Sequence, residues 1–334
     1  MDDDITRLRL TDSQDFLALA PYLLGYQPCE QLVFVVIASG RLLLTGAVAA
    51  EGVLQESSTR DSISTALDQF DDPLVLLACW SHDEELADQV LGRAEVWADP
   101  RRVLDSIHVG PRRWRSRWAG ADHAGGEVED LDGLPVVAQA IVAGLVRAPD
   151  RSHAVAVAEG PGASPALEGR LLAAEDHLHP LDWTHWEARA LDVQEAGLAA
   201  VQDSAHPSSP VEVQGDPLGW EGLLAEAAVL CGDEVTRERL WMRLGRREAQ
   251  AALDFWSAVV ATTPEPWARG PLVMMAFSAW LAGQGALHVA CLERLTRLGA
   301  EGSQVEVLEL ANRCAIPPSR WEQVRAAEVF GVPA

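Results

Sequence analysis

Arginine and tryptophan are concentrated between residues 101 and 118 of a chain that is otherwise acidic. The segment holds Arg101, Arg102, Arg112, Arg113, Trp114, Arg115, Arg117 and Trp118. Because side chains alternate between the two faces of a strand, we expect Arg113, Arg115 and Arg117 to share one face. Trp114, Ser116 and Trp118 then share the other face. The pattern predicts an exposed cationic face and an aromatic face.

Two interpretations of this segment stay open. Guanidinium groups suit phosphate and carboxylate, and tryptophan stacks on planar groups. The segment is therefore a candidate binding site for an anion or an acidic partner, with the residues Arg112, Arg113, Trp114, Arg115, Arg117 and Trp118. In the alternative, which is the more common one for charge-rich segments, the tryptophans pack in the core and the arginines pair with acids of this chain or a partner.

Histidines form a second cluster in "AEDHLHPLDWTHWEAR". His177, His179 and His185, with Asp176, Asp182 and Glu187 nearby, are residue types that ligate metals. Pro180 interrupts the helical spacing between them, so a polar corner between two helices is expected and no metal site. The sequence has no G-x-S-x-G motif, and isolated histidines such as His82 and His108 define no triad, so no catalytic residue is nominated.

Composition narrows the class of protein. The 334 residues contain 26 Lys and Arg against 50 Asp and Glu, a net charge of −24 that repels nucleic acid and anionic lipid. No apolar run is long enough for a membrane span, and "MDDDITRLRL" is unlike a secretion signal. The five cysteines are widely spaced, and Cys29 and Cys79 are predicted to be small core residues of a cytoplasmic protein.

The elements that must position these residues begin with a helix in "LTDSQDFLALAPYLLG", capped by Thr11 or Asp12 and ended by Gly25. Gly25 is alone and follows a helix, so it is not the start of a phosphate loop, and no cofactor is expected. Further elements are predicted as a hairpin, "QLVFVVIAS" and "GRLLLTGAVAA", a helix at 59–70, a strand "DPLVLLACW", a helix "SHDEELADQVLGRAEVWA" capped by Ser81, a hairpin around Gly110-Pro111, and a helix "LPVVAQAIVAGLV".

These patterns predict two domains. Residues 1–150 form an α/β domain with a mixed sheet and the Arg/Trp hairpin. Residues 151–334 form an all-helical domain with a loop near 205–219 and with helices at 217–231, 233–246, 247–261, 270–283, 285–299 and 302–314. Small residues on both sides of Gly283-Gln284-Gly285 let two helices approach closely, which is typical of tetratricopeptide-like hairpins.

Three blocks of sequence, in this order, carry a resemblance to a known family. They are "LRLTDSQDFLALAPYLLGYQPCEQLVFVVI", "VLDSIHVGPRRWRSRW" and "PLVMMAFSAWLAGQGALHVACLERL". The chain resembles the actinobacterial family of unknown function DUF4192 over nearly its whole length. The resemblance implies a cytoplasmic protein with an α/β half and a helical half, and it implies no activity, substrate or catalytic residue.

The function expected from these observations is that of a non-catalytic protein-interaction or regulatory module. Its partner is another protein or a second copy of the chain, and neither nucleic acid nor a membrane. The alternative is a binder of a small anionic ligand, or an enzyme, that uses the Arg/Trp hairpin. A deep pocket where Arg113 or Arg115 meets polar groups would favour the alternative.

Overall fold

The fold was analysed in a computed structural model, which describes residues 12–55, 57–70, 72–99, 102–118, 125–202, 211–213 and 216–330. By its internal contacts the chain divides into two compact units. The first comprises Met1–Ala154 with Arg313–Pro317, and the second comprises Val155–Asn312 with Pro318–Ala334. Thr11 and Arg101, which the sequence singled out, lie outside the described residues.

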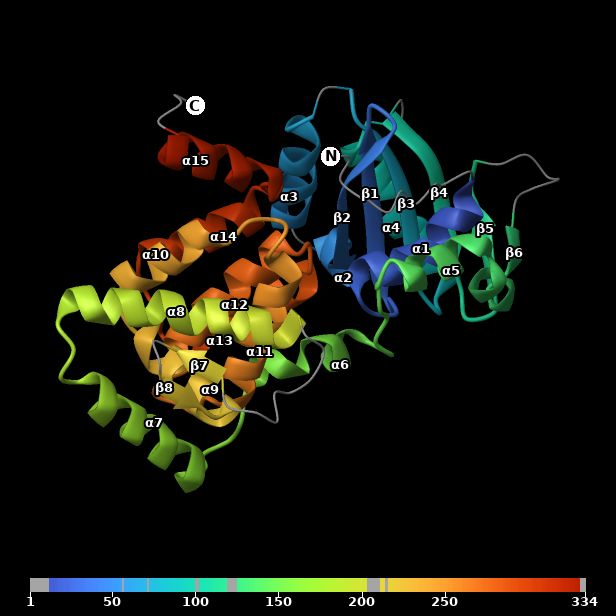
Figure 1. The fold of residues 1–334 in the computed structure, drawn as a ribbon. Coiled ribbons are helices and arrows are strands. Elements are labelled where there is room, and N and C mark those ends of the chain that lie inside the picture. The colour runs from blue at the N-terminus through green and yellow to red at the C-terminus, as the bar shows by residue number, and fades with distance from the viewer. Residues whose placement is uncertain are drawn as a thin grey trace. The chain divides into compact units, whose positions relative to one another are not determined.

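The first unit contains a six-stranded mixed sheet (Figure 1). Its strands, in spatial order, are β2 (Arg41–Ala49), β1 (Gln31–Ala38), β3 (Leu74–Trp80), β4 (Val103–Val109), β5 (Arg113–Ser116) and β6 (Gly125–Glu127). The pair β3 and β4 is parallel and every other neighbouring pair is antiparallel. The predicted mixed sheet and both predicted hairpins are confirmed.

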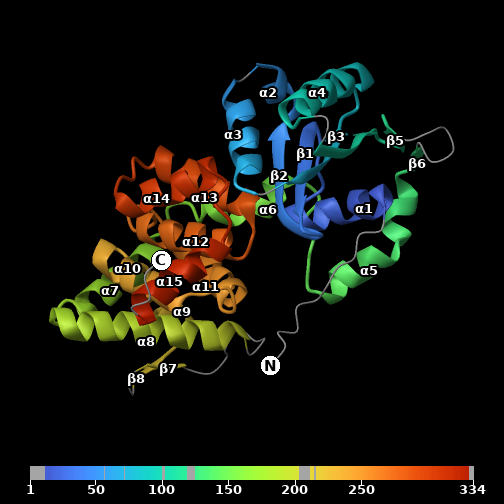
Figure 2. The same ribbon diagram turned by 90° about the horizontal axis from the view of Figure 1, so that it is seen from above.

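Helices cover both faces of this sheet (Figure 2). One face carries α2 (Ala50–Gln55), α3 (Ser57–Asp68) and α4 (Glu84–Trp97), and the other carries α1 (Ser13–Leu24) and α5 (Pro135–Val142). A short 3-10 turn at Glu129–Gly133 precedes α5, and α6 (Arg151–Val155) follows it. Side chains on both faces of β1 are buried. Phe34 and Val36 pack with the α2–α4 layer, while Val35 is buried on the opposite face, so each face of the sheet must be covered by helices.

Local sequence accounts for the ends of α1. The carboxylate of Asp12 accepts hydrogen bonds from the backbone N–H groups of Gln14 and Asp15, at 2.9 Å each, so Asp12 is the N-cap. Gly25 ends the helix with φ 80° and ψ 3°, in the left-handed region. Both features agree with the sequence analysis.

The start of α4 differs from the prediction. Asp83, and not Ser81, is the N-cap, because the Asp83 carboxylate accepts from the N–H groups of Glu85 and Leu86 at 2.9 and 3.1 Å. The Ser81 hydroxyl donates instead to the carboxylate of Glu30, at 2.7 Å. The Asp83 carboxylate, two residues after Ser81, satisfies the free N–H groups at the start of the helix.

The second unit is built mainly of helices. They are α7 (Pro165–Leu178), α8 (Trp183–Gln202), α9 (Trp220–Leu230), α10 (Glu234–Arg243), α11 (Ala249–Thr262), α12 (Arg269–Leu281), α13 (Gly285–Arg297), α14 (Ser303–Arg313) and α15 (Ser319–Phe330). A 3-10 turn at Ala156–Glu159 leads into them. Helix α12 is buried on nearly all sides and packs against α11 and α13. The tetratricopeptide-like character of this unit stays a prediction.

Two features of this unit were not predicted. Strands β7 (Val211–Val213) and β8 (Asp216–Leu218) pair antiparallel, so the expectation of an all-helical half is wrong. The reason is the alternation in Val-Glu-Val, which favours a short strand within the loop predicted at 205–219. In addition, Gly197 of α8 leaves room for Phe255, since a Cβ there would lie 2.3 Å from the ring. The close approach of α8 to α11 therefore depends on this glycine.

Replacing Gly25 with alanine is expected to lower the free energy of unfolding by about 1 kcal/mol, because a Cβ is disfavoured at this positive φ. Gly133→Ala is the matched control, since Gly133 lacks a positive φ and has no atom within 4 Å of the added Cβ. Urea unfolding of both variants measures the difference. Equal stability of the two variants would contradict the role given to Gly25.

Candidate functional site

The Arg/Trp segment forms the predicted hairpin of β4 and β5. In its register His108 is opposite Arg115, and Val109 is opposite Trp114. The turn is closed by the N–H of Gly110, which donates to the carbonyl of Arg113 at 2.9 Å. The pairing directs the arginine face of β5 toward α4, the helix that connects β3 to β4.

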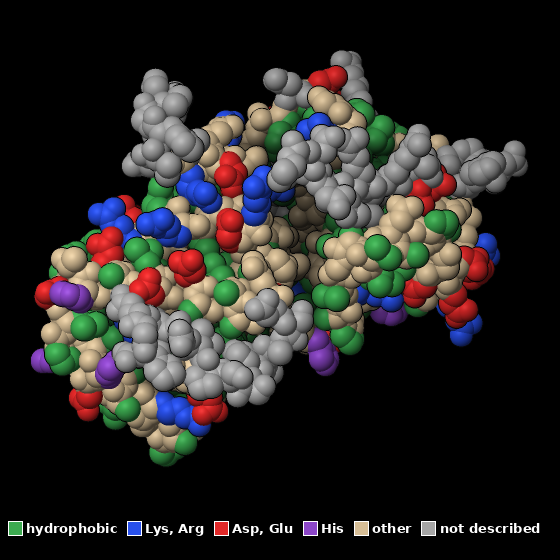
Figure 3. Space-filling model, viewed as in Figure 1, with side chains coloured by type: hydrophobic (Ala, Val, Ile, Leu, Met, Phe, Trp, Pro, Cys, Tyr) green, Lys and Arg blue, Asp and Glu red, His purple; other side chains and the backbone are tan. Residues whose placement is uncertain are grey.

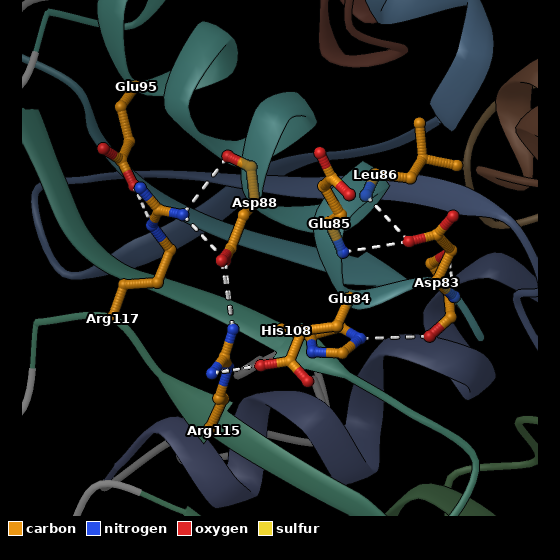
Figure 4. Close-up of polar contacts among 10 residues, drawn as sticks. Asp83, Glu84, Glu85, Leu86, Asp88, Glu95, His108, Arg115 and Arg117 are labelled. Atoms are coloured by element: carbon orange, nitrogen blue, oxygen red, sulfur yellow. Dashed lines mark hydrogen bonds and ion pairs between the residues drawn. The ribbon is translucent and has the colours of Figure 1, made fainter.

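Acidic residues of α4 meet these arginines. Glu84, Asp88 and Glu95 recur at spacings that place them on one side of the helix. Arg115 contacts Glu84 at 2.5 Å and Asp88 at 3.1 Å. Arg117 donates to Asp88 at 2.9 Å and lies 3.1 Å from Glu95 (Figure 4). Asp88 therefore accepts hydrogen bonds from two arginines, and these ion pairs join the acidic side of α4 to the segment of β5.

The arginine face is exposed as expected, since Arg113, Arg115 and Arg117 are all exposed residues, but the exposure of the side chains decreases along the segment. The side chain of Arg113 is 76% exposed and lies 3.4 Å from Glu127, whereas the side chain of Arg117 is only 29% exposed. The cause is α4, whose acidic side contacts Arg115 and Arg117 and covers these side chains in part. Of the two interpretations of the arginines, the pairing with acids of this chain describes Arg115 and Arg117.

The two tryptophans of the segment also differ in exposure. Trp114 is buried, and Gly126 of β6 packs on its indole, where a Cβ would lie 3.0 Å from Nε1. Trp118 lies two residues beyond Ser116, the last residue of β5, and is 43% exposed. The two tryptophans therefore do not form one aromatic surface, because the strand ends at Ser116 before the alternation reaches Trp118.

The depression beside this network is open and acidic. It has a volume of about 650 Å³, lies open to solvent over most of its extent, and is lined by Glu84, Glu85, Asp88, Gln89 and Arg117. A second depression, in the helical unit, has a volume of about 10 Å³ and is too small for a metabolite. The open one offers an anion a single arginine among three carboxylates, which is unfavourable electrostatically.

A second group of side chains that can do chemistry lies where β1 begins and β3 ends. Cys29 and Glu30 directly precede β1, and His82 follows β3 by two residues. Because β1 and β3 are antiparallel, with Gln31 opposite Trp80, these two ends meet. A sulfur, a carboxylate oxygen and an imidazole nitrogen from the three residues lie within 4.8 Å of one another.

Hydrogen bonds hold Glu30 at the centre of this group. Its Oε2 accepts from the Ser81 hydroxyl at 2.7 Å, and its Oε1 accepts from the His82 backbone N–H at 2.9 Å. Nδ1 of His82 also lies 2.9 Å from Oε1. The backbone of Glu30 has φ 49°, an uncommon value for a residue other than glycine, and such positions are frequent at functional sites.

The electrostatics of the group favour an ionised Glu30. Burial acts to raise the pKa of this carboxyl, but the hydrogen bonds from the His82 N–H and the Ser81 hydroxyl outweigh it and hold the pKa below its usual range. The thiol of Cys79, on the neighbouring strand, behaves differently. Burial, with the charge of Glu30 as a smaller cause, raises its pKa to about 12.

Cys29 is exposed, so its prediction as a core residue is wrong, whereas Cys79 is buried as predicted. The apolar run that predicts burial starts only at Leu32, after the turn that holds Cys29. His82 is isolated in the sequence and was not expected to take part in a site. Its proximity to Cys29 follows from the pairing of β1 with β3, and the sequence predicted only the hairpin of β1 with its other neighbour, β2.

The predicted histidine cluster does not come together as a metal site among the described residues. His177 is on α7 and lies 3.7 Å from Glu226, while His179 is the residue that ends α7. Nδ1 of His185 lies 2.7 Å from Asp182, at the start of α8. The polar corner between two helices is confirmed.

These observations define a chain with an α+β unit, whose mixed sheet has helices on both faces, and a largely helical unit. Within the described ranges, none of the helices has both the length and the apolar character needed to cross a lipid bilayer. The model of the family described as "Domain of unknown function (DUF4192)" matches residues 14–318. The chain belongs to this family, as the resemblance indicated. Neither a search of curated proteins nor one of solved structures gave a match.

The contact of Asp88 with Arg117 is expected to contribute about 0.5–1 kcal/mol to stability, because both side chains are partly covered and hydrogen-bonded. A double-mutant cycle of Asp88→Asn and Arg117→Gln measures this coupling, which should shrink in 1 M salt. The cycle of Asp88 with Arg113 is the control, since Arg113 pairs with Glu127. Equal coupling in both cycles would argue against the assignment.

Glu30 is expected to make stability depend on pH. Its pKa is lower in the folded chain than in the unfolded one, so ionised Glu30 stabilises the fold above about pH 4.3, and this contribution is lost as the pH falls through the folded-state pKa. Glu30→Gln should therefore be less stable than wild type at pH 7, with a smaller difference near pH 3.

Urea unfolding at both pH values measures these differences. Glu51→Gln, at an exposed position of α2, corrects for the loss of one surface charge. A difference between Glu30→Gln and wild type that grew on acidification would show that the carboxylate is not stabilised by its neighbours.

Proposed function

We propose that this chain is a non-catalytic protein-interaction or regulatory module, and that the turn of the β4–β5 hairpin binds an acidic segment of a partner protein or of a second copy. The observation that carries the proposal is the contrast along the hairpin. All four arginines are exposed, but Arg115 and Arg117 form close ion pairs with α4, whereas the ion pair of Arg113 at the turn is long, at 3.4 Å to Glu127.

The charge of the turn supports an acidic partner. Among the residues that the structure describes, Arg112 has no ion-pair partner, and Arg113 has a long contact of 3.4 Å to Glu127. The chain as a whole carries a net charge of −24. A short acidic segment can reach the turn without bringing a large polyanion against this negative field, whereas DNA or RNA cannot.

The shape of the surface supports a protein rather than a small molecule. The depression next to the hairpin is open and is lined mostly by carboxylates. On the face shown in Figure 3, acidic and basic side chains are interspersed and are not gathered into one cationic patch. An exposed arginine pair of this kind is typical of a contact at the edge of a protein interface, where it provides orientation and association rate.

The test uses the double variant Arg112→Glu with Arg113→Glu in the full chain. Self-association is measured by sedimentation velocity, and binding of an acidic partner is measured with a fluorescent decaglutamate peptide. We expect the wild-type chain to self-associate or to bind the peptide in a salt-sensitive manner, and the double variant to lose at least about tenfold in affinity.

Arg313→Glu with Arg320→Glu is the matched control, because it makes the same change in charge at exposed positions of α14 and α15. It should retain wild-type behaviour. Equal losses in both double variants would assign the effect to net charge and overturn the proposal. Absence of both activities in the wild-type chain would overturn it as well, as would tight DNA binding that Arg112 and Arg113 support.

A further inference from the structure

The group formed by Cys29, Glu30 and His82 has the composition of a transition-metal site. Thiolate, imidazole and carboxylate are the three side-chain ligands that Zn²⁺ accepts. All three residues are exposed, and one ligand atom of each lies within 4.8 Å of the other two. From this geometry we infer that Cys29, Glu30 and His82 bind one Zn²⁺ ion, independently of the function proposed for the hairpin.

The spacing needs little adjustment. Ligand atoms at about 2.0–2.3 Å from a tetrahedral ion lie roughly 3.3–3.8 Å apart. The spacings here are all within 4.8 Å, at most about 1 Å above this range, which exposed side chains close by rotation. The contact of 2.9 Å between His82 Nδ1 and Glu30 Oε1 shows that imidazole and carboxylate already face each other.

The backbone holds two of the three ligands in place. Glu30 is adjacent to the first residue of β1, and its Oε2 is oriented by the hydroxyl of Ser81, which is buried. The backbone N–H of His82 donates to the same carboxylate, so the two ligand-bearing segments are bonded to each other. Hydrogen bonds of this kind orient metal ligands and raise metal affinity.

The charges match a divalent cation. The thiolate of Cys29 and the carboxylate of Glu30 together neutralise Zn²⁺, and His82 binds as a neutral ligand. Asp83, Glu84 and Glu85 follow directly at the start of α4 and add negative potential at this edge of the sheet. With three protein ligands on the surface, the fourth position of the ion faces solvent.

No metal site is expected from the sequence, because the apparent cluster of metal ligands in it is the set of histidines between α7 and α8. Cys29 and His82 are separated by 53 positions, 82 − 29, and are adjacent only through the pairing of β1 with β3. They form no short spacing of the kind that metal motifs show in a sequence.

The test uses the full chain without an affinity tag, reduced with a phosphine that does not bind metal. Co²⁺ alone is titrated first, because a thiolate ligand gives it a charge-transfer band in the near ultraviolet. We expect one equivalent to produce this band, and Cys29→Ser to abolish it while circular dichroism shows an unchanged fold. Zn²⁺ titrated by calorimetry should bind at least about tenfold more weakly to Cys29→Ser and to His82→Ala.

Two variants serve as controls. Cys314→Ser removes a cysteine that is partly exposed, and His185→Ala removes an exposed histidine that also contacts a carboxylate but has no thiol among its described neighbours. Both should keep the band and the affinity of the wild-type chain. A Co²⁺ complex without a thiolate band, or Zn²⁺ affinity that is the same in wild type and Cys29→Ser, would overturn the inference.

Discussion

The position of α4 on the sheet is the constraint on which the rest of the first unit depends. The helix connects the parallel strands β3 and β4, and it buries Ala87, Val90 and Leu91 against the face that also holds Leu77 and Cys79. Burying side chains such as those of Val90 and Leu91 contributes roughly 1.5–3 kcal/mol each, more than a partly exposed ion pair does. The apolar contact therefore places the helix, and the polar contacts along its rim follow from that placement.

Both candidate sites lie where this helix meets the strands. The start of α4 follows His82, so the turn after β3 is held next to the start of β1 by hydrogen bonds to Glu30. The acidic side of the same helix forms ion pairs with Arg115 and Arg117, whereas Arg113, next to the hairpin turn, pairs with Glu127 of β6. The ion pairs of Arg115 and Arg117 therefore follow from the placement of this helix.

The second unit depends on close helix packing rather than on charge. Its core surrounds α12, and small residues such as Gly197 allow aromatic rings to enter between helices. The buried pair of Arg189 and Glu226, at 2.8 Å, is an exception. The guanidinium of Arg189 donates to both carboxylate oxygens of Glu226, so this pair joins α8 to α9.

Local chemistry determined much of this protein. The cap of α1 at Asp12, its end at Gly25, the two hairpins and the helices of the second unit follow from side chains that act within a few residues of each other. Tertiary structure alone decided which acids pair with the arginines and which histidine meets a cysteine. These outcomes depend on strand order and on the helix that covers each face, and they join residues such as Cys29 and His82 through contacts that no local pattern records.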